Sequence, residues 1–157
     1  MEEKCSDSKA RALRIVSKRS ISVAELKKRL TSKGDSEEVA DFIINWLLEV
    51  GLLDDLQYSH SIVKHYSGKG YGPARIKDEL FKRGIPREMW DEVLNTELDK
   101  VDIESAALVF LEKKLKGSLD EVDLNRAANG LVRRGFSYEQ ARQAIKGYIE
   151  ESHDYSK

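Results

Sequence analysis

A short basic motif that ends in glycine occurs three times in this chain, at nearly equal intervals. It reads Leu-Thr-Ser-Lys-Gly at 30–34, Leu-Phe-Lys-Arg-Gly at 80–84 and Leu-Val-Arg-Arg-Gly at 131–135, so the glycines are about 50 residues apart. Apolar residues at helical spacing flank each copy, and glycine often ends a helix because it adopts the left-handed conformation without strain. A repeat of this length predicts an array of similar units rather than one irregular domain.

The residues around each motif predict a unit of helix, helix, basic glycine turn and helix. Ser22 and Glu25 have capping-box spacing before the second helix, and Asp35 or Ser36 can begin the third. Pro73 suits the first turn of a helix because its missing N–H group would have no partner there. No segment alternates apolar and polar residues as a strand would. We therefore predict an all-α fold of three stacked, helix-turn-helix-like repeats, at 1–52, 53–99 and 100–157.

The third helix and the glycine-rich stretch 68–72 lead to two further predictions. The helical period of the third helix places Phe42 and Val50 on its inner face, together with Ile43 and Leu47. The glycines between 68 and 72 resemble a phosphate-binding loop in composition only, because the spacing GxxxxGK[ST] and a preceding strand are both missing. We interpret this stretch as a flexible hinge between two helices.

Composition limits the compartment and the partners. The chain of 157 residues has a formal net charge of −1, so no global field attracts nucleic acid or a membrane surface. Cys5 is the only cysteine, which excludes an internal disulfide and fits a reducing compartment. The N-terminus lacks the apolar core of a signal peptide, and the apolar run 42–50 is too short to span a bilayer. We expect a cytoplasmic, monomeric protein without membrane contact.

The sequence contains no convincing catalytic or metal-binding set. His60 and His65 are five residues apart, which suits no single helix face, and neither has a cysteine or acidic partner in ligand spacing. Cys5 lacks a nearby histidine that could activate it. Asp54 and Asp55 are better explained as helix caps than as a carboxylate pair. We therefore predict no enzymatic activity, no bound metal and no cofactor.

Basic residues gather on the middle helix of each predicted unit. One interpretation is a set of solvated faces whose charges also suit the negative ends of helix dipoles. The other is a discontinuous stripe that contacts a polyanion or an acidic protein groove. These helices are rich in lysine and have few Asn or Gln side chains for pairing with base edges, which argues against sequence-specific reading of duplex DNA.

Taken together, the motifs resemble those of the RecX family, modulators of the recombinase RecA. The resemblance runs from about Ser8 to Glu150 and includes Arg19-Ser20 with Glu25-Leu26 and Leu30, the turn 51–58, the stretch 70–85 and the stretch 131–136. It implies an elongated, curved array and a non-enzymatic role. Such proteins bind RecA and its nucleoprotein filament in the filament groove. They limit filament growth and inhibit ATPase, strand-exchange and coprotease activity, which modulates DNA repair, recombination and the SOS response.

We expect eight basic residues to contact RecA or filament-bound DNA: Lys27, Lys28, Arg75, Lys77, Lys82, Arg83, Arg133 and Arg134. Independent binding to DNA is expected to be weak, since the chain is slightly acidic. The alternative is a stand-alone helix-turn-helix regulator, which would bind duplex DNA tightly without RecA and with a steep salt dependence. The sequence leaves open whether the protein caps filament ends, inserts along filaments or removes monomers.

Overall fold

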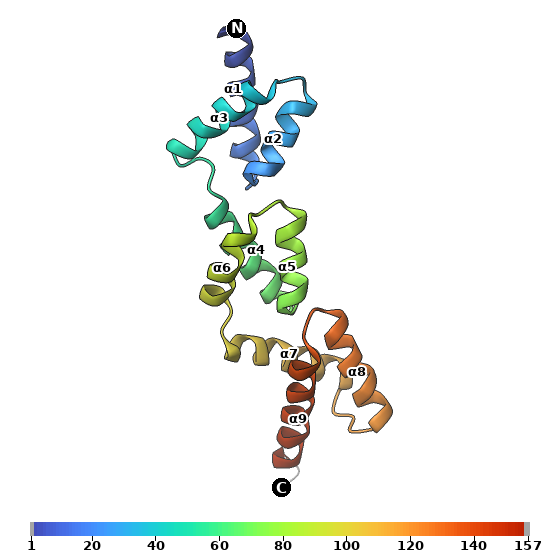
Figure 1. The fold of residues 1–157 in the computed structure, drawn as a ribbon. Coiled ribbons are helices and arrows are strands. Elements are labelled where there is room, and N and C mark those ends of the chain that lie inside the picture. Colours follow the sequence, from blue (N-terminus) through green and yellow to red (C-terminus); the bar gives the residue numbers. More distant parts are fainter. Residues whose placement is uncertain (1, 156–157) are drawn as a thin grey trace. The chain divides into compact units, whose positions relative to one another are not determined.

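The computed structural model describes residues 2–155, with side chains described over 5–99 and 102–153, and this part of the chain is helical with no strand (Figure 1). The all-α prediction is confirmed, and the helices follow one another as three groups of three. They are α1 (Glu2–Lys18), α2 (Val23–Ser32), α3 (Glu37–Glu49), α4 (Asp55–Gly68), α5 (Pro73–Lys82), the 3₁₀ helix η1 (Arg87–Met89), α6 (Trp90–Glu97), α7 (Lys100–Leu115), α8 (Glu121–Arg133) and α9 (Tyr138–Tyr155).

The helices begin where their capping residues predict. The Glu25 N–H donates to Ser22 Oγ at 3.0 Å and the Ser22 N–H donates to Glu25 Oε1 at 3.2 Å, which completes the capping box of α2. Ser36 caps α3, and Asp120 caps α8. The first helix begins at Glu2, several residues before Ser8, where the family resemblance begins.

The three turn glycines, Gly34, Gly84 and Gly135, all adopt left-handed conformations, with φ of +106°, +74° and +101°. In each case the next residue donates its N–H to the carbonyl of the motif leucine, at 3.2 Å for Asp35, 3.0 Å for Ile85 and 3.1 Å for Phe136. The basic glycine motif is therefore a repeated helix C-cap, as its composition predicts.

The chain divides into two compact units, each described here by itself. Unit 1 contains the residues up to Ser61 together with Leu80–Trp90, and unit 2 contains Ile62–Glu79 together with the residues from Asp91 onward. The middle group of helices contributes to both units, since the divisions fall inside α4 and α5. The repeat boundaries expected near 52 and 99 fall in the connections before α4 and α7 and stay a prediction.

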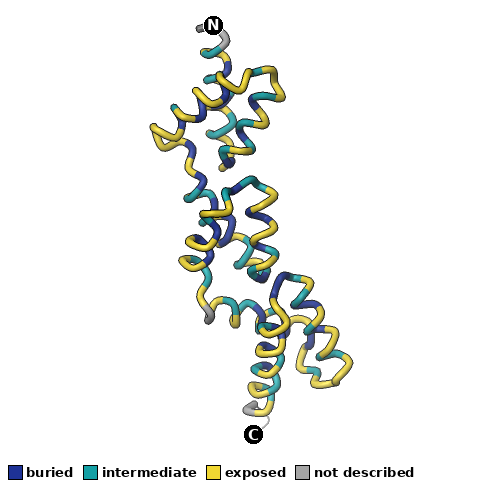
Figure 2. Tube along the Cα trace, in the orientation of Figure 1, coloured by how far each residue is buried: buried dark blue, intermediate teal, exposed yellow. Residues whose placement is uncertain are grey.

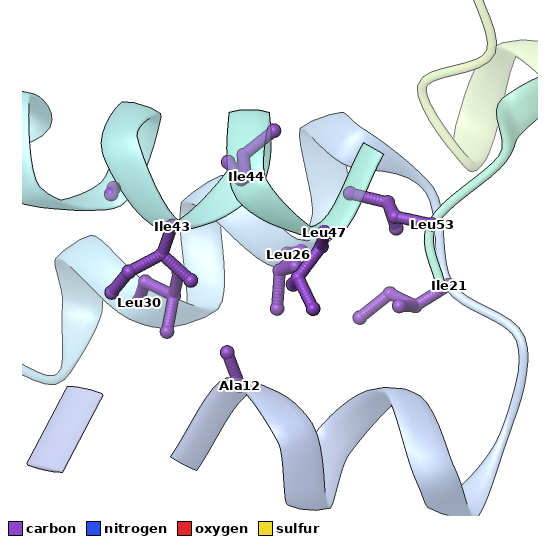
Figure 3. Packing of buried hydrophobic residues seen from close by; sticks show 9 residues of the cluster. Ala12, Ile21, Leu26, Leu30, Ile43, Ile44, Leu47 and Leu53 are labelled. Carbon is purple, nitrogen blue, oxygen red and sulfur yellow. The ribbon is translucent and has the colours of Figure 1, made fainter. Parts of the chain in front are cut away.

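The core of unit 1 lies where α1, α2 and α3 meet (Figure 3). Leu26, Leu30, Ile43 and Leu47 are fully buried there. The expectation that Phe42 lies inside is wrong, because its side chain is 58% exposed. Residues next to each other on a helix point about 100° apart, so covering the Ile43 side of α3 leaves Phe42 outside.

The expectation for Val50 is also wrong. This residue is 52% exposed and lies just after the last turn of α3, beyond the part of the helix that contributes fully buried side chains. The core of unit 2 is a separate cluster, formed by α7, α8 and α9. Leu111 and Leu131 are fully buried in it, with Phe136 and Tyr148 close to full burial. Figure 2 shows buried and exposed positions alternating along the helices.

Candidate interaction surfaces

Within unit 1, the turn after α5 packs onto the first residues of α2. A Cβ atom added to Gly84 would lie 2.6 Å from the Cβ of Ala24, so only glycine fits this contact. The hydroxyl of Ser22 donates a hydrogen bond to the carbonyl oxygen of Arg83. Arg83 in turn donates from Nη1 to the Tyr58 hydroxyl at 2.7 Å, with its guanidinium carbon 5.9 Å from the ring centroid. We call this arrangement the first junction.

Within unit 2, the turn after α8 packs onto the start of α5 in the same manner, and we call this the second junction. The Gly72 N–H donates to the Arg134 carbonyl at 2.8 Å, and the Ala74 N–H donates to the Gly135 carbonyl at 3.0 Å. A Cβ on Gly72 would lie 2.5 Å from the carbonyl carbon of Gly135. The interpretation of the stretch 68–72 as a flexible hinge is therefore replaced by a packed backbone contact.

The Arg134 side chain holds the second junction from the other side. Its Nη2 donates to the Lys69 carbonyl at 2.9 Å and its Nε to the Gly70 carbonyl at 3.3 Å. Its guanidinium carbon lies 4.6 Å from the Tyr71 ring centroid and 5.2 Å from that of Phe110. These contacts employ the planar donor fork of arginine, which lysine does not have.

The two ends of the repeat series depart from this pattern. Gly34 occupies the turn position of the first repeat, yet a Cβ there would meet no described atom within 4 Å. At the other end, α8 begins fourteen residues before its turn glycine, whereas α2 and α5 begin eleven residues before theirs. Three residues are nearly one helical turn. Asp123, in the position of Ser22 and Gly72, is therefore inside a helix rather than at its entrance.

Four of the eight predicted contact residues are exposed and the other four are half-buried. Lys28, Lys77, Lys82 and Arg133 are exposed. Lys27 lies 3.1 Å from Asp41, whose hydrogen bond and negative charge raise the pKa of this lysine. Lys27 is therefore one of the four half-buried residues, and its charge is paired with that of Asp41.

The other three half-buried residues are arginines. Two of them, Arg83 and Arg134, take part in the junctions described above. Arg75 pairs with Glu79 at 3.7 Å and lies 5.2 Å from the Tyr71 ring centroid. Tyr71 also carries Arg134, so the structure brings these two predicted residues together on one ring.

A groove of about 630 Å³ lies in unit 2 between the end of α4 and α7. Ala106, Val109 and Phe110 give it an apolar floor, and Val109 is 48% exposed. Both charge signs line it, with Lys64 of the lining 3.9 Å from Glu97. Because the lining is mixed in charge, it selects no single ligand chemistry.

A second cleft, of about 260 Å³, lies in unit 1 between α1 and α2, and we call it the basic cleft. Six of its lining residues are cationic: Arg11, Arg14, Lys18, Arg19, Arg29 and Lys33. The expected contact set includes none of them, although Arg29 and Lys33 lie on α2 and at its end. The spacing of Arg11, Arg14 and Lys18 along α1, three and then four residues apart, is the signal that places them on one helix face.

Among the residues with described side chains, no group of three His, Cys, Asp or Glu residues could hold a metal ion. The helices of the described chain are too short or too polar to cross a membrane.

Comparison with known proteins places the chain in a family. A family model for the second three-helix domain of RecX matches residues 54–94. The regulatory protein RecX of Vibrio parahaemolyticus is 31% identical over 140 residues, which make up 88% of this chain and 89% of that protein. The regulatory protein RecX of Pseudomonas putida KT2440 is 30% identical over 138 residues and covers 87% of each chain.

Solved structures agree on the fold. The crystal structure of RecX from Lactobacillus salivarius superposes with a TM-score of 0.87 at 24% identity, covering 95% of this chain and 99% of that one. A second crystal structure of regulatory protein RecX gives a TM-score of 0.78 at 22% identity, covering 91% of this chain and 71% of that one. With the repeated helical unit, its glycine turns and an identity of 30% or more over 87% or more of its length, this chain belongs to the RecX family of regulatory proteins.

Proposed function

We propose that this protein binds RecA and the RecA filament on single-stranded DNA, and that it inhibits filament growth, ATP hydrolysis, strand exchange and coprotease activity. The observation that supports the proposal most directly is the identity of 31% to a regulatory protein RecX over 88% of the chain. The protein would act by binding alone, as a cytoplasmic monomer, without catalysis and without a cofactor.

The exposed cations support a mechanism built on many modest contacts. Lys28 lies on α2, Lys77 on α5 and Arg133 at the end of α8, so each repeat presents a cation from its middle helix. Several weak contacts joined in one chain give a combined affinity far above that of each contact, provided that all can engage together. We propose that these exposed residues, with Lys82, touch RecA or filament-bound DNA.

Arg83 and Arg134 have a different proposed role. The Arg134 guanidinium contacts the neighbouring repeat through the carbonyls of Lys69 and Gly70, whereas the Arg83 guanidinium holds the Tyr58 hydroxyl of its own repeat. Their contribution to RecA binding would be indirect, because both side chains hold the turns through which successive repeats contact one another. Replacing either arginine would loosen a contact within the fold and would thereby displace the residues of the binding surface.

The proposal is tested by following ATP hydrolysis of RecA on single-stranded DNA while this protein is added. We expect progressive inhibition that is complete near a stoichiometric excess over RecA. Undiminished hydrolysis at that excess would contradict the proposal.

The contact set is tested by comparing two triple variants of equal charge change. Lys28→Glu, Lys77→Glu and Arg133→Glu together should raise the concentration needed for half-inhibition at least about tenfold, which corresponds to about 1.4 kcal/mol. The matched control is Lys113→Glu, Lys114→Glu and Lys146→Glu, three other exposed lysines. Equal effects of the two triple variants would show that general charge, and not this surface, carries the binding.

A further inference from the structure

We propose that the basic cleft binds the phosphodiester backbone of a nucleic-acid strand, and that it does so without RecA. This inference goes beyond the proposed function, because the cleft contains none of the eight predicted contact residues. Apart from its six cations, the described lining consists of Ile15 and Ser32. The cleft belongs wholly to unit 1, between α1 and α2.

The charge in the basic cleft is almost uncompensated. No carboxylate is found among its described lining residues. Arg11 lies 3.7 Å from Asp35, a residue of the turn before α3. The other five cations form no ion pair with a carboxylate among the residues whose side chains are described. Like charges around so small a volume repel one another, and an anion in the cleft would relieve that repulsion.

Helix dipoles explain only part of this cluster. Lys18 lies in the last turn of α1 and Arg29 in the last turn of α2, where a cation is favourable without any ligand. The dipole effect falls off within one turn of the helix end. Arg11 and Arg14 lie further inside α1 and still face the same cleft, so they require another explanation.

The lining also selects the class of anion. It contains no aromatic side chain, so bases would find no stacking platform. It contains no Asn or Gln for pairing with base edges. Its arginines present planar donor forks that fit phosphate oxygens. Cations supplied by two helices suit a ligand with successive phosphates, and such a ligand is a nucleic-acid backbone bound without sequence preference.

The test uses the full-length chain and fluorescently labelled oligonucleotides without RecA, as a single strand and as a duplex, with anisotropy measured over a series of salt concentrations. The variant Arg14→Gln with Arg29→Gln should weaken binding about tenfold or more. For a single strand it should also lower the slope of log K against log salt by about 1.4, for two lost phosphate contacts. Arg14→Lys with Arg29→Lys keeps both charges and should retain most of the affinity.

The matched control is Lys113→Gln with Lys114→Gln, which removes two exposed cations from the last turn of α7. We expect this control to keep both the affinity and the salt slope. Binding of either oligonucleotide with loss only in the Arg14 and Arg29 variant supports the proposal. Equal loss in both variants, or no binding by the unaltered chain at low salt, overturns it. Binding of inorganic phosphate without binding of either oligonucleotide also overturns it.

Thermal unfolding separates a ligand site from a purely structural cluster. If the cations are crowded for the sake of a ligand, Arg14→Gln with Arg29→Gln should keep or raise the melting temperature, because repulsion is removed. A lowered melting temperature with unchanged oligonucleotide affinity would assign the cluster to helix stabilisation and overturn the proposal. The RecA ATPase assay is independent, since inhibition of RecA without oligonucleotide binding would leave the proposed function standing and remove only this inference.

Discussion

The backbone N–H of Gly72 donates a hydrogen bond of 2.8 Å to the carbonyl oxygen of Arg134, across 62 residues of sequence. A neighbouring bond from Ala74 to the carbonyl of Gly135 measures 3.0 Å. Two backbone segments can approach this closely only where neither carries a Cβ between them, and both contact points are glycines. Gly72 and Gly135 therefore act as a pair, and they form a packing surface as well as a turn.

Replacing Gly135 by alanine should destabilise the protein by about 3 kcal/mol or more. The new Cβ would lie 2.4 Å from the backbone nitrogen of Arg75, at a φ of +101° that alanine rarely adopts. Gly34→Ala is the matched control, since its φ of +106° is similar but its Cβ meets nothing within 4 Å. It should cost only about 1–2 kcal/mol. Urea unfolding measures both, and equal costs would show that the second junction contributes little.

Ser22→Ala should lower the free energy of unfolding by about 2–3 kcal/mol. The fully buried Ser22 hydroxyl caps α2 and also donates to the carbonyl of Arg83, which would be left without that partner. Ser36→Ala removes a cap from an exposed position and should cost about 1 kcal/mol. The comparison requires only chemical denaturation of the two variants. A smaller loss for Ser22 than for Ser36 would contradict the role given to the first junction.

Arg134→Gln and Arg133→Gln should separate stability from binding. The first variant loses two hydrogen bonds from a charged donor and the stacking on Tyr71, and should be destabilised by about 2 kcal/mol. Arg133 is exposed, so its replacement should change stability by no more than about 0.5 kcal/mol while weakening inhibition of RecA. Unfolding curves and the ATPase assay report the two effects. A stable Arg134 variant would show that its contacts are incidental.

The carboxyl group of Asp55 gives unit 1 a pH dependence of defined sign. Burial raises the pKa of Asp55 above its ordinary value, although the Val23 N–H, which donates to it at 2.9 Å, opposes the shift. Because the folded pKa exceeds the unfolded one, the folded state binds more protons in that window. The free energy of unfolding therefore falls as pH rises from about 4 through the raised pKa.

The measurement is the difference between unaltered protein and Asp55→Asn across that pH range. The asparagine can still accept from Val23 but does not ionise, so its stability should fall less as pH rises. Parallel stability profiles for the two proteins would contradict the assignment. Asp55→Ala, which also loses the acceptor, should be less stable than Asp55→Asn at every pH in the range.

Much of the fold follows from local sequence. The capping box at Ser22, the left-handed turn glycines and the start of α5 at Pro73 each depend on neighbouring residues, and the structure confirms them. What local sequence does not show is which face of a helix another element covers. Phe42 has the period of an inner residue yet is exposed, because helical period alone does not define how wide the covered face is.

The interaction surfaces were less predictable for the same reason. Arg134 and Lys28 look alike in sequence, as basic residues on middle helices. Only the fold shows that one guanidinium is held by backbone carbonyls while the other side chain is exposed. The basic cleft depends on residues of α1 and α2 that are far apart in sequence, so counting charges within one helix could not reveal it.

Because α8 begins early, the middle helix of the third repeat cannot accept a turn from another repeat as α2 and α5 do. Each junction is formed at a helix entrance, where the Gly84 turn packs against Ala24 and the Gly135 carbonyl accepts from the Ala74 N–H. The third repeat has Asn125 at the position of Ala24 and Ala74 and covers the entrance with an additional turn of helix. A fourth repeat, or the Gly34 turn of a second molecule, would therefore meet a continuous helix at this position in place of a helix entrance. We therefore expect the chain not to extend head to tail through this type of contact.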